Sequence, residues 1–227
     1  MGYIGNRPTA VPLTSADFVD DSVTLAKMAG LARGKLIYGD TSGDPAALAV
    51  GAADEVLTHD GTDFDWAAAS GGGLTGADQW RTNTDVSGDV DPLTNVERVD
   101  DGGFAGIGSA MTQSSGVFTF PATGIWLIRF DALFRGTTDS RFNNAFINYT
   151  TNDAVSYDVG AYNSCLTQQT NSSSAYGFCS QAFIFDVTST STHKVKFNVS
   201  VDDNITTLQG ISTANNTTFT FLKLGDT

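Results

Sequence analysis

Residues 125–134, IWLIRFDALF, are the segment that most limits the folds open to this chain. In a strand, alternate side chains point to opposite faces, and here both faces are apolar. One face carries Trp126, Ile128, Phe130, Ala132 and Phe134, and the other carries Ile125, Leu127 and Leu133. A strand that is apolar on both faces lies centrally and needs a covering layer on each side. The segment therefore predicts either a sandwich core plus a subunit interface or a sheet with two covering layers.

Residues 77–227 contain enough such segments to build the sandwich. Alternation in KVKFNVSVD places four valine and phenylalanine side chains inward and their neighbours outward. The strands predicted are 117–120, 125–134, 141–149, 157–167, 177–187, 194–202 and 218–224. All acidic residues except Glu55 and Glu97 are aspartate, and the chain has 24 glycines, a composition typical of turns between strands. The sequence predicts an all-β fold.

The first third of the chain has a different amino-acid composition. Residues 67–76, AAASGGGLTG, lack core-forming side chains and are predicted to be a linker. Residues 34–66 read as brief strands separated by Gly and Asp turns, too poor in apolar side chains for a core of their own. Such a stem would gain stability by wrapping around other copies of the chain. Residues 1–33 form the predicted arm and short helix (15–33), with apolar anchor candidates Tyr3, Ile4, Val11 and Leu13.

The segment 77–227 resembles the complement q-component and tumour necrosis factor superfamily. The likeness is carried by residues 116–121, by GIWLIRFDALF at 124–134, and by TTFTFLKL at 217–224. It implies a ten-stranded jelly-roll sandwich that assembles as a homotrimer, with the last strand beside the threefold axis. On this basis Phe219 and Phe221 are the candidates for residues at the trimer axis.

The first part of the chain is similar to fibre and appendage proteins of tailed bacteriophages, particularly marine ones. The segments MGYIGNRP, ARGKLIYGDTSGDPAALAVG and EVLTHDGTDFDWAA carry this likeness. It implies that the first residues attach to other virion proteins and that the Gly-Asp-rich part forms a stem. Together the two resemblances imply a virion protein, assembled in the host cytoplasm, with a jelly-roll head presented outward.

Charge and the few reactive residues exclude several other functions. The formal net charge of −13 opposes binding to nucleic acids and to anionic lipids, and no apolar run is long enough for membrane insertion. The two histidines, His59 and His193, are expected in exposed turns, with no nucleophile pattern beside either. The adjacent acids Asp100-Asp101 and Asp202-Asp203 are expected to be loop residues rather than a glycosidase pair. No catalytic residue is predicted.

No cofactor is predicted. The stretch DVSGDVD places Asp85, Asp89 and Asp91 in a pattern faintly like a calcium loop, but it lacks the spaced glutamate of an EF-hand. Calcium remains possible here, since some members of the resembled superfamily bind it, but a solvated acidic loop is the favoured interpretation.

Two further groups of residues follow from the predicted strands. Cys165 and Cys179 flank a polar turn, and they would lie within disulfide reach if their strands paired as a hairpin. In the resembled fold these strands belong to different sheets, so both a bridge and free thiols remain open. Tyr157, Tyr162 and Tyr176 offer flat rings with hydroxyl groups and are the candidates for a ligand surface, although ordinary strand composition explains them equally well.

These observations lead to one functional expectation with one alternative. The chain is expected to be a trimeric phage fibre or appendage protein whose head binds a glycan or protein of the host surface. The alternative is a capsid, neck or tail decoration protein whose head stabilises the particle instead.

Overall fold

The computed structural model describes residues 14–17, 30–69, 73–169 and 174–227. The chain forms two compact units, Met1–Gly71 and Gly72–Thr227. The division falls inside the predicted linker, but strand β4 includes residues 67 and 68, and strand β5 begins at residue 76. Within the described ranges, no helix is long and apolar enough to cross a membrane.

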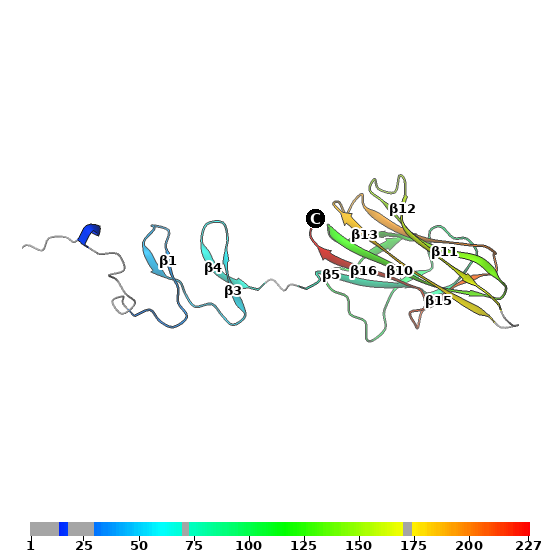
Figure 1. Cartoon of the computed structure of the whole chain (residues 1–227), viewed down its shortest axis with the longest axis horizontal. Helices are drawn as coiled ribbons and strands as arrows, with labels where there is room; N and C mark the ends of the chain where they lie inside the picture. Colours follow the sequence, from blue (N-terminus) through cyan, green and yellow to red (C-terminus); the bar gives the residue numbers. More distant parts are fainter. Residues whose placement is uncertain (1–13, 18–29, 70–72, 170–173) are drawn as a thin grey trace, which may run out of the picture. The chain divides into compact units, whose positions relative to one another are not determined.

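The second unit consists of strands in two sheets (Figure 1). The long strands match the predicted segments to within two residues at each end. They are β10 (Gly124–Gly136), β11 (Ser140–Thr150), β12 (Asp158–Thr167), β13 (Ala175–Val187), β14 (Lys194–Val201) and β16 (Thr218–Gly225). The shorter ones are β5 (Gly76–Thr82), β6 (Thr84–Ser87), β7 (Val96–Arg98), β8 (Thr112–Ser114), β9 (Val117–Thr119) and β15 (Thr207–Ile211).

The strand order is that of a jelly roll. One sheet has seven strands in the order β6-β15-β10-β16-β5-β7, with β13 also paired to β10, and the other has five in the order β12-β11-β14-β9-β8. The chain crosses between the sheets from β7 to β8, from β9 to β10, from β10 to β11, from β12 to β13, from β13 to β14 and from β14 to β15. Ten strands form two five-stranded layers, and the short strands β6 and β15 extend one of them. The predicted all-β, ten-stranded jelly roll is confirmed.

A largely aromatic core lies between the two sheets. All five residues predicted on the inner face of β10 are at most 1% exposed. The ring of Phe118 packs edge-to-face on Phe197 at 5.4 Å, and Phe197 lies 4.4 Å from Phe219 between ring centroids. Full burial of one such side chain contributes about 1.5–3 kcal/mol to folding. The alternation read from the sequence therefore translates directly into the packing of the core.

Antiparallel register fixes which loops share an end of this unit. Ile125 pairs with Gly225, and Lys223 pairs with Gly76, so the start of β10, the start of β5 and the C-terminus lie together (Figure 1). The loops after β10, β12 and β14 consequently lie at the opposite end of the sandwich. The linker from the first unit enters at the C-terminal end.

The first unit contains two hairpins built on one plan. Strand β1 (Ile37–Gly39) pairs with β2 (Pro45–Ala47), and β3 (Glu55–His59) pairs with β4 (Phe64–Ala68). The carboxylates of Asp40 and Asp60, twenty positions apart, each accept backbone N–H bonds that close the turn, at 2.7–3.0 Å. Before each hairpin, a similar turn (32–35 or 52–55) has a residue with positive φ, Gly34 or Asp54, at its third position. The hairpins are tandem copies of a single module.

This unit has almost no core of its own. In residues 30–69, Leu48 is the only buried large apolar side chain. Trp66 lies over Gly51, and its indole N–H donates to the carbonyl of Ala49 at 2.7 Å, which joins the second hairpin to the segment before it. Other large apolar side chains are 41–55% exposed, namely Leu31, Leu36, Ile37, Val50, Val56, Leu57 and Phe64.

The predicted helix is only partly within the described residues. Ser15–Asp17 form one 3-10 turn, η1, and residues 30–33 are not helical. Positions 18–29 lie outside the described residues, as do the anchor candidates Tyr3, Ile4, Val11 and Leu13. The helix and the anchor stay predictions.

Candidate functional site

The outer face of the seven-stranded sheet is largely apolar. Leu127 of β10 lies opposite Ile184 of β13 on one side and opposite Leu222 of β16 on the other, and Leu133 lies opposite Phe178. Ile184 is 62% exposed and Phe178 is 56% exposed. Proteins in water rarely leave apolar patches of this kind exposed unless a partner covers them.

A polar belt crosses the middle of this apolar face. Arg129 and Asp131 of β10 form an ion pair at 2.8 Å, and the Gln79 side-chain amide donates to the Thr220 hydroxyl at 3.1 Å. Register places Thr220 beside Arg129. The face therefore combines apolar rows with a small set of directional groups, which is how protein interfaces that fix a single orientation are composed.

The outer face of the five-stranded sheet is polar and has one aromatic pair. Tyr162 of β12 stacks on Phe146 of β11, with ring centroids 5.4 Å apart and planes inclined by 21°. Tyr157, just before β12, lies under the ammonium group of Lys196 at 4.5 Å. Of the three tyrosines predicted as a ligand surface, Tyr157 and Tyr162 thus belong to this face. Tyr176 lies on β13, on the outer face of the other sheet.

The structure places the two predicted axis residues elsewhere. Phe219 and Phe221 are fully buried within the sandwich core, where Phe219 stacks on Phe130 at 4.9 Å. A side chain enclosed by its own subunit cannot line a contact between subunits, so this prediction is wrong. The prediction failed because β16 is apolar on both faces and the bulkier phenylalanine side chains pack inward. Leu222 and Leu224 occupy the outer face instead.

In the structure the thiols of Cys165 and Cys179 are not bridged but share a hydrogen bond. Cys179 is 1% exposed, and its thiol also donates to the carbonyl of Asn143 at 3.3 Å. The hydrogen bond between the two thiols lowers the pKa of Cys165 and, together with burial, raises the pKa of Cys179. The strands β12 and β13 belong to different sheets, so the thiols lie between the layers. The disulfide stays a prediction.

The acidic residues singled out in the sequence are held in separate places. Asp85 pairs with Arg135, Asp89 accepts from the backbone N–H of Val201, and Asp91 pairs with Lys196 at 2.6 Å. In the ranges that the structure describes, no group of three or more ligating side chains comes together as a metal site. His59 is exposed as expected. His193 was also expected to be exposed, but this prediction is wrong, because the His193 side chain is buried against the ring of Phe185.

Arg81 is a structural residue that the sequence analysis missed. Its guanidinium is fully buried and binds Glu97 and Asp101, each at 2.8 Å, as well as Asp100 and the carbonyl of Ser212. Burial alone would lower the pKa of Arg81, but these carboxylates raise it. The adjacent acids Asp100 and Asp101 therefore fasten a loop to β5. No local pattern reveals this cluster, because its members meet only through strand pairing.

The other adjacent acids are also engaged. Asp202 forms a bidentate ion pair with Arg141, which lowers the pKa of the carboxyl group. Burial raises the pKa of Asp203, but hydrogen bonds from the hydroxyls of Thr138 and Thr206 and from backbone N–H groups outweigh it, so the pKa lies below its ordinary value of 3.8. Both residues stabilise the loops at the end opposite the linker.

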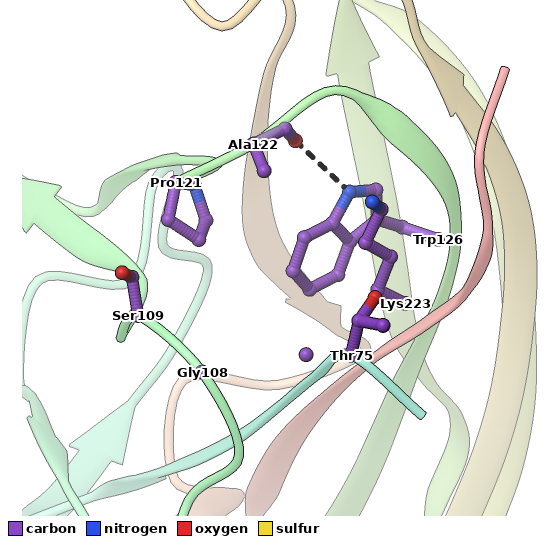
Figure 2. A pocket seen from close by; sticks show the side chains of 8 residues that line it. Thr75, Gly108, Ser109, Pro121, Ala122, Trp126 and Lys223 are labelled. Carbon is purple, nitrogen blue, oxygen red and sulfur yellow. Dashed lines mark hydrogen bonds between the residues drawn. The ribbon is translucent and has the colours of Figure 1, made fainter. Parts of the chain in front are cut away.

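A cavity of about 260 Å³ lies at the linker end of the sandwich (Figure 2). Trp126 forms one wall, and its indole N–H donates to the carbonyl of Ala122 at 3.2 Å. The ammonium group of Lys223 pairs with Asp226 at 2.7 Å. The lining is completed by Thr75, Gly76, Gly108, Ser109 and Pro121.

Comparison with known proteins adds only a structural likeness. Scans against protein-family models and against curated protein sequences give no match. Among solved structures, the chain is similar to Eiger TNF from S. frugiperda, with 15% identity, a TM-score of 0.47, and coverage of 66% of this chain and 93% of that one. It is also similar to murine APRIL, with 13% identity, a TM-score of 0.44, and coverage of 66% and 98%. The strand order described above, rather than this likeness, defines the fold.

Proposed function

We propose that the chain is a homotrimeric fibre or appendage protein of a tailed-phage particle, attached through its N-terminal residues, whose jelly-roll head binds the host cell surface. The proposal combines the two sequence resemblances with the surfaces that the fold leaves uncovered. Its chemistry is binding rather than turnover.

The observation that carries the proposal is the apolar outer face of β10, β13 and β16. Its proposed occupants are the other copies of the same chain, because the polar belt of Arg129, Asp131, Thr220 and Gln79 holds both donors and acceptors, so the donors of one copy can meet the acceptors of the next. Each large apolar side chain that becomes fully buried adds about 1.5–3 kcal/mol to assembly. A small number of such side chains on each copy offsets the entropy lost on association.

The hairpin unit supports the same arrangement. Units of this size seldom fold alone without additional stabilisation, and oligomerisation is one common source of it. The exposed apolar side chains of both hairpins would be covered by neighbouring copies, giving a stem. Three heads on one stem would also combine weak contacts into strong adhesion, since each further contact forms at a high effective concentration.

Assembly is tested by light scattering on the full chain at several concentrations. We expect a mass near three times 23.9 kDa that does not fall on dilution. Ile184→Asp should dissociate the trimer, because it introduces a charge into the apolar face. Val159→Asp is the matched control, since Val159 is 58% exposed and lies on β12, away from that face. A stable monomer, or equal effects of the two variants, would refute the proposed assembly.

Adhesion is tested on particles that carry the chain without residues 77–227. If these particles assemble normally and adsorb poorly to their host, the head is adhesive. If the shells or tails fall apart instead, the head has the stabilising role of a decoration protein and the adhesive proposal is wrong.

A further inference from the structure

We propose that the outer face of the five-stranded sheet binds an uncharged glycan, with the ring of Tyr162 as its stacking platform. This inference rests on the adhesive function proposed above and specifies the ligand class and the surface of the head. The surface, called here the amide face, consists of Asn144, Phe146, Tyr162, Ser164, Asn198 and Ser200.

Register brings these residues together from three strands. Asn144 of β11 lies opposite Ser164 of β12 on one side and opposite Ser200 of β14 on the other. Phe146, two residues further along β11, lies opposite Tyr162 and Asn198. Alternation turns all of these side chains outward, because Ala145 and Ile147 between them are fully buried in the core. Two adjacent rows therefore form a continuous surface.

The aromatic pair offers a flat ring to a ligand. Tyr162 is 64% exposed although one face of its ring stacks on Phe146. The stacking holds the ring in a fixed orientation, so a ligand that packs on it loses little side-chain entropy of the protein. The apolar C–H face of a pyranose is a suitable partner for such a ring, and the phenol hydroxyl adds a donor at its edge.

The neighbouring polar groups are free to bind hydroxyls. Asn148 donates its side-chain amide hydrogen to the amide oxygen of Asn198, which fixes the orientation of the Asn198 amide. In the described part of the chain, the side chains of Asn144, Ser164 and Ser200 make no hydrogen bond to the protein. The same holds for the amide N–H groups of Asn198. Donors and acceptors at this spacing suit a ligand that carries many hydroxyl groups.

The charge pattern favours a neutral ligand. The chain has a net charge of −13, but none of the six residues of the amide face is charged. Lys196, one row further along, is neutralised by Asp91, and Arg141 at the other end is paired with Asp202. An anionic glycan on these six residues would meet the repulsion of the whole chain, and the cations that flank them, Lys196 and Arg141, are already paired with carboxylates. A protein partner is less suited to the amide face, because this face has few large apolar side chains.

Native affinity electrophoresis of the full chain tests this inference. The gels contain dextran, amylopectin, laminarin or galactomannan as neutral probes, with alginate as an anionic one. We expect retardation by at least one neutral polysaccharide. Tyr162→Ala should weaken that binding about tenfold, in line with the loss of one aromatic stacking contact, and Tyr162→Phe should retain most of it. Val155→Ala is the matched control, because Val155 is 82% exposed and lies in the loop between β11 and β12, outside both sheets.

Each of the remaining outcomes overturns the inference. These are the absence of retardation by every neutral probe, retardation by alginate alone, equal losses of binding in the Tyr162→Ala and Val155→Ala variants, and a change in native mass on Tyr162→Ala. The last would mean that the amide face is covered by another copy of the chain. If particles that carry the Tyr162→Ala variant still adsorb to the host, the inference about the amide face has failed but the adhesive function proposed above stands.

Discussion

Replacing Phe219 with alanine should destabilise the head strongly, although the sequence alone suggested an interface role. The ring is fully buried and lies 4.4, 4.9 and 6.0 Å from the rings of Phe197, Phe130 and Phe118. Its removal leaves a cavity that these rigid rings cannot fill, so we expect a loss of about 3–5 kcal/mol in the free energy of unfolding. With an m-value of about 2 kcal/mol/M, the urea midpoint would fall by about 2 M.

The comparison variant is Leu222→Ala, three positions along the same strand and on its outer face. It should cost less than about 1 kcal/mol in subunit stability, since the side chain is only partly buried within the subunit. Unfolding would be followed by tryptophan fluorescence at several protein concentrations, because assembly makes apparent stability depend on concentration. A loss below about 1 kcal/mol for Phe219→Ala, or a larger concentration-independent loss for Leu222→Ala, would refute this assignment of the two faces.

Three further predictions follow from local geometry. The folded state lowers the pKa of Asp203, so the contribution of this residue to stability is complete above pH ~4 and is lost as the pH falls below that value. Urea midpoints measured from pH ~2.5 to ~7 should therefore fall less steeply at acid pH in Asp203→Asn than in the unmodified chain. Iodoacetamide should alkylate Cys165 before Cys179, and peptide mass mapping would show this order. Mild oxidation should form a disulfide between the two residues within one chain, so a covalent dimer on a non-reducing gel would contradict the predicted pairing. Gly116→Ala should cost about 1–3 kcal/mol in thermal or urea unfolding, since φ is +80° and a Cβ atom would lie 2.4 Å from the carbonyl oxygen of Leu93; an unchanged midpoint would show that this loop can move.

The sequence predicted the strands whose alternation of apolar and polar side chains can be seen in consecutive residues. Strands β10 to β14 and β16 have long alternating runs, and burial on one face is enough to specify them. Strand β5 was missed because it contains Asp78 and Arg81, which are buried yet charged. Arg98 and the Trp80 indole bind Asp78, and acids sixteen to twenty positions later bind Arg81. Only the completed fold supplies these partners, so hydropathy cannot identify such a strand.

The candidate surfaces show a similar limit. Tyr162 stood out as an aromatic residue among polar neighbours, but nothing in the sequence joined it to Phe146 or Asn144, because the register between β11 and β12 sets that contact. Tyr176 appeared equivalent to Tyr162, yet the crossing of the chain between the sheets places it on the other face. The residue types of a surface can be read from a sequence, whereas their grouping depends on topology.

The tandem hairpins have a consequence for how the length of this protein can change. Each hairpin closes its own turn through Asp40 or Asp60 and pairs only its own two strands, so neither needs the other to set its register. Duplication or loss of one twenty-residue segment would leave the pairing inside every remaining hairpin intact. The number of hairpins that precede the jelly roll in the chain could thus evolve one hairpin at a time, independently of whatever surface the jelly roll presents.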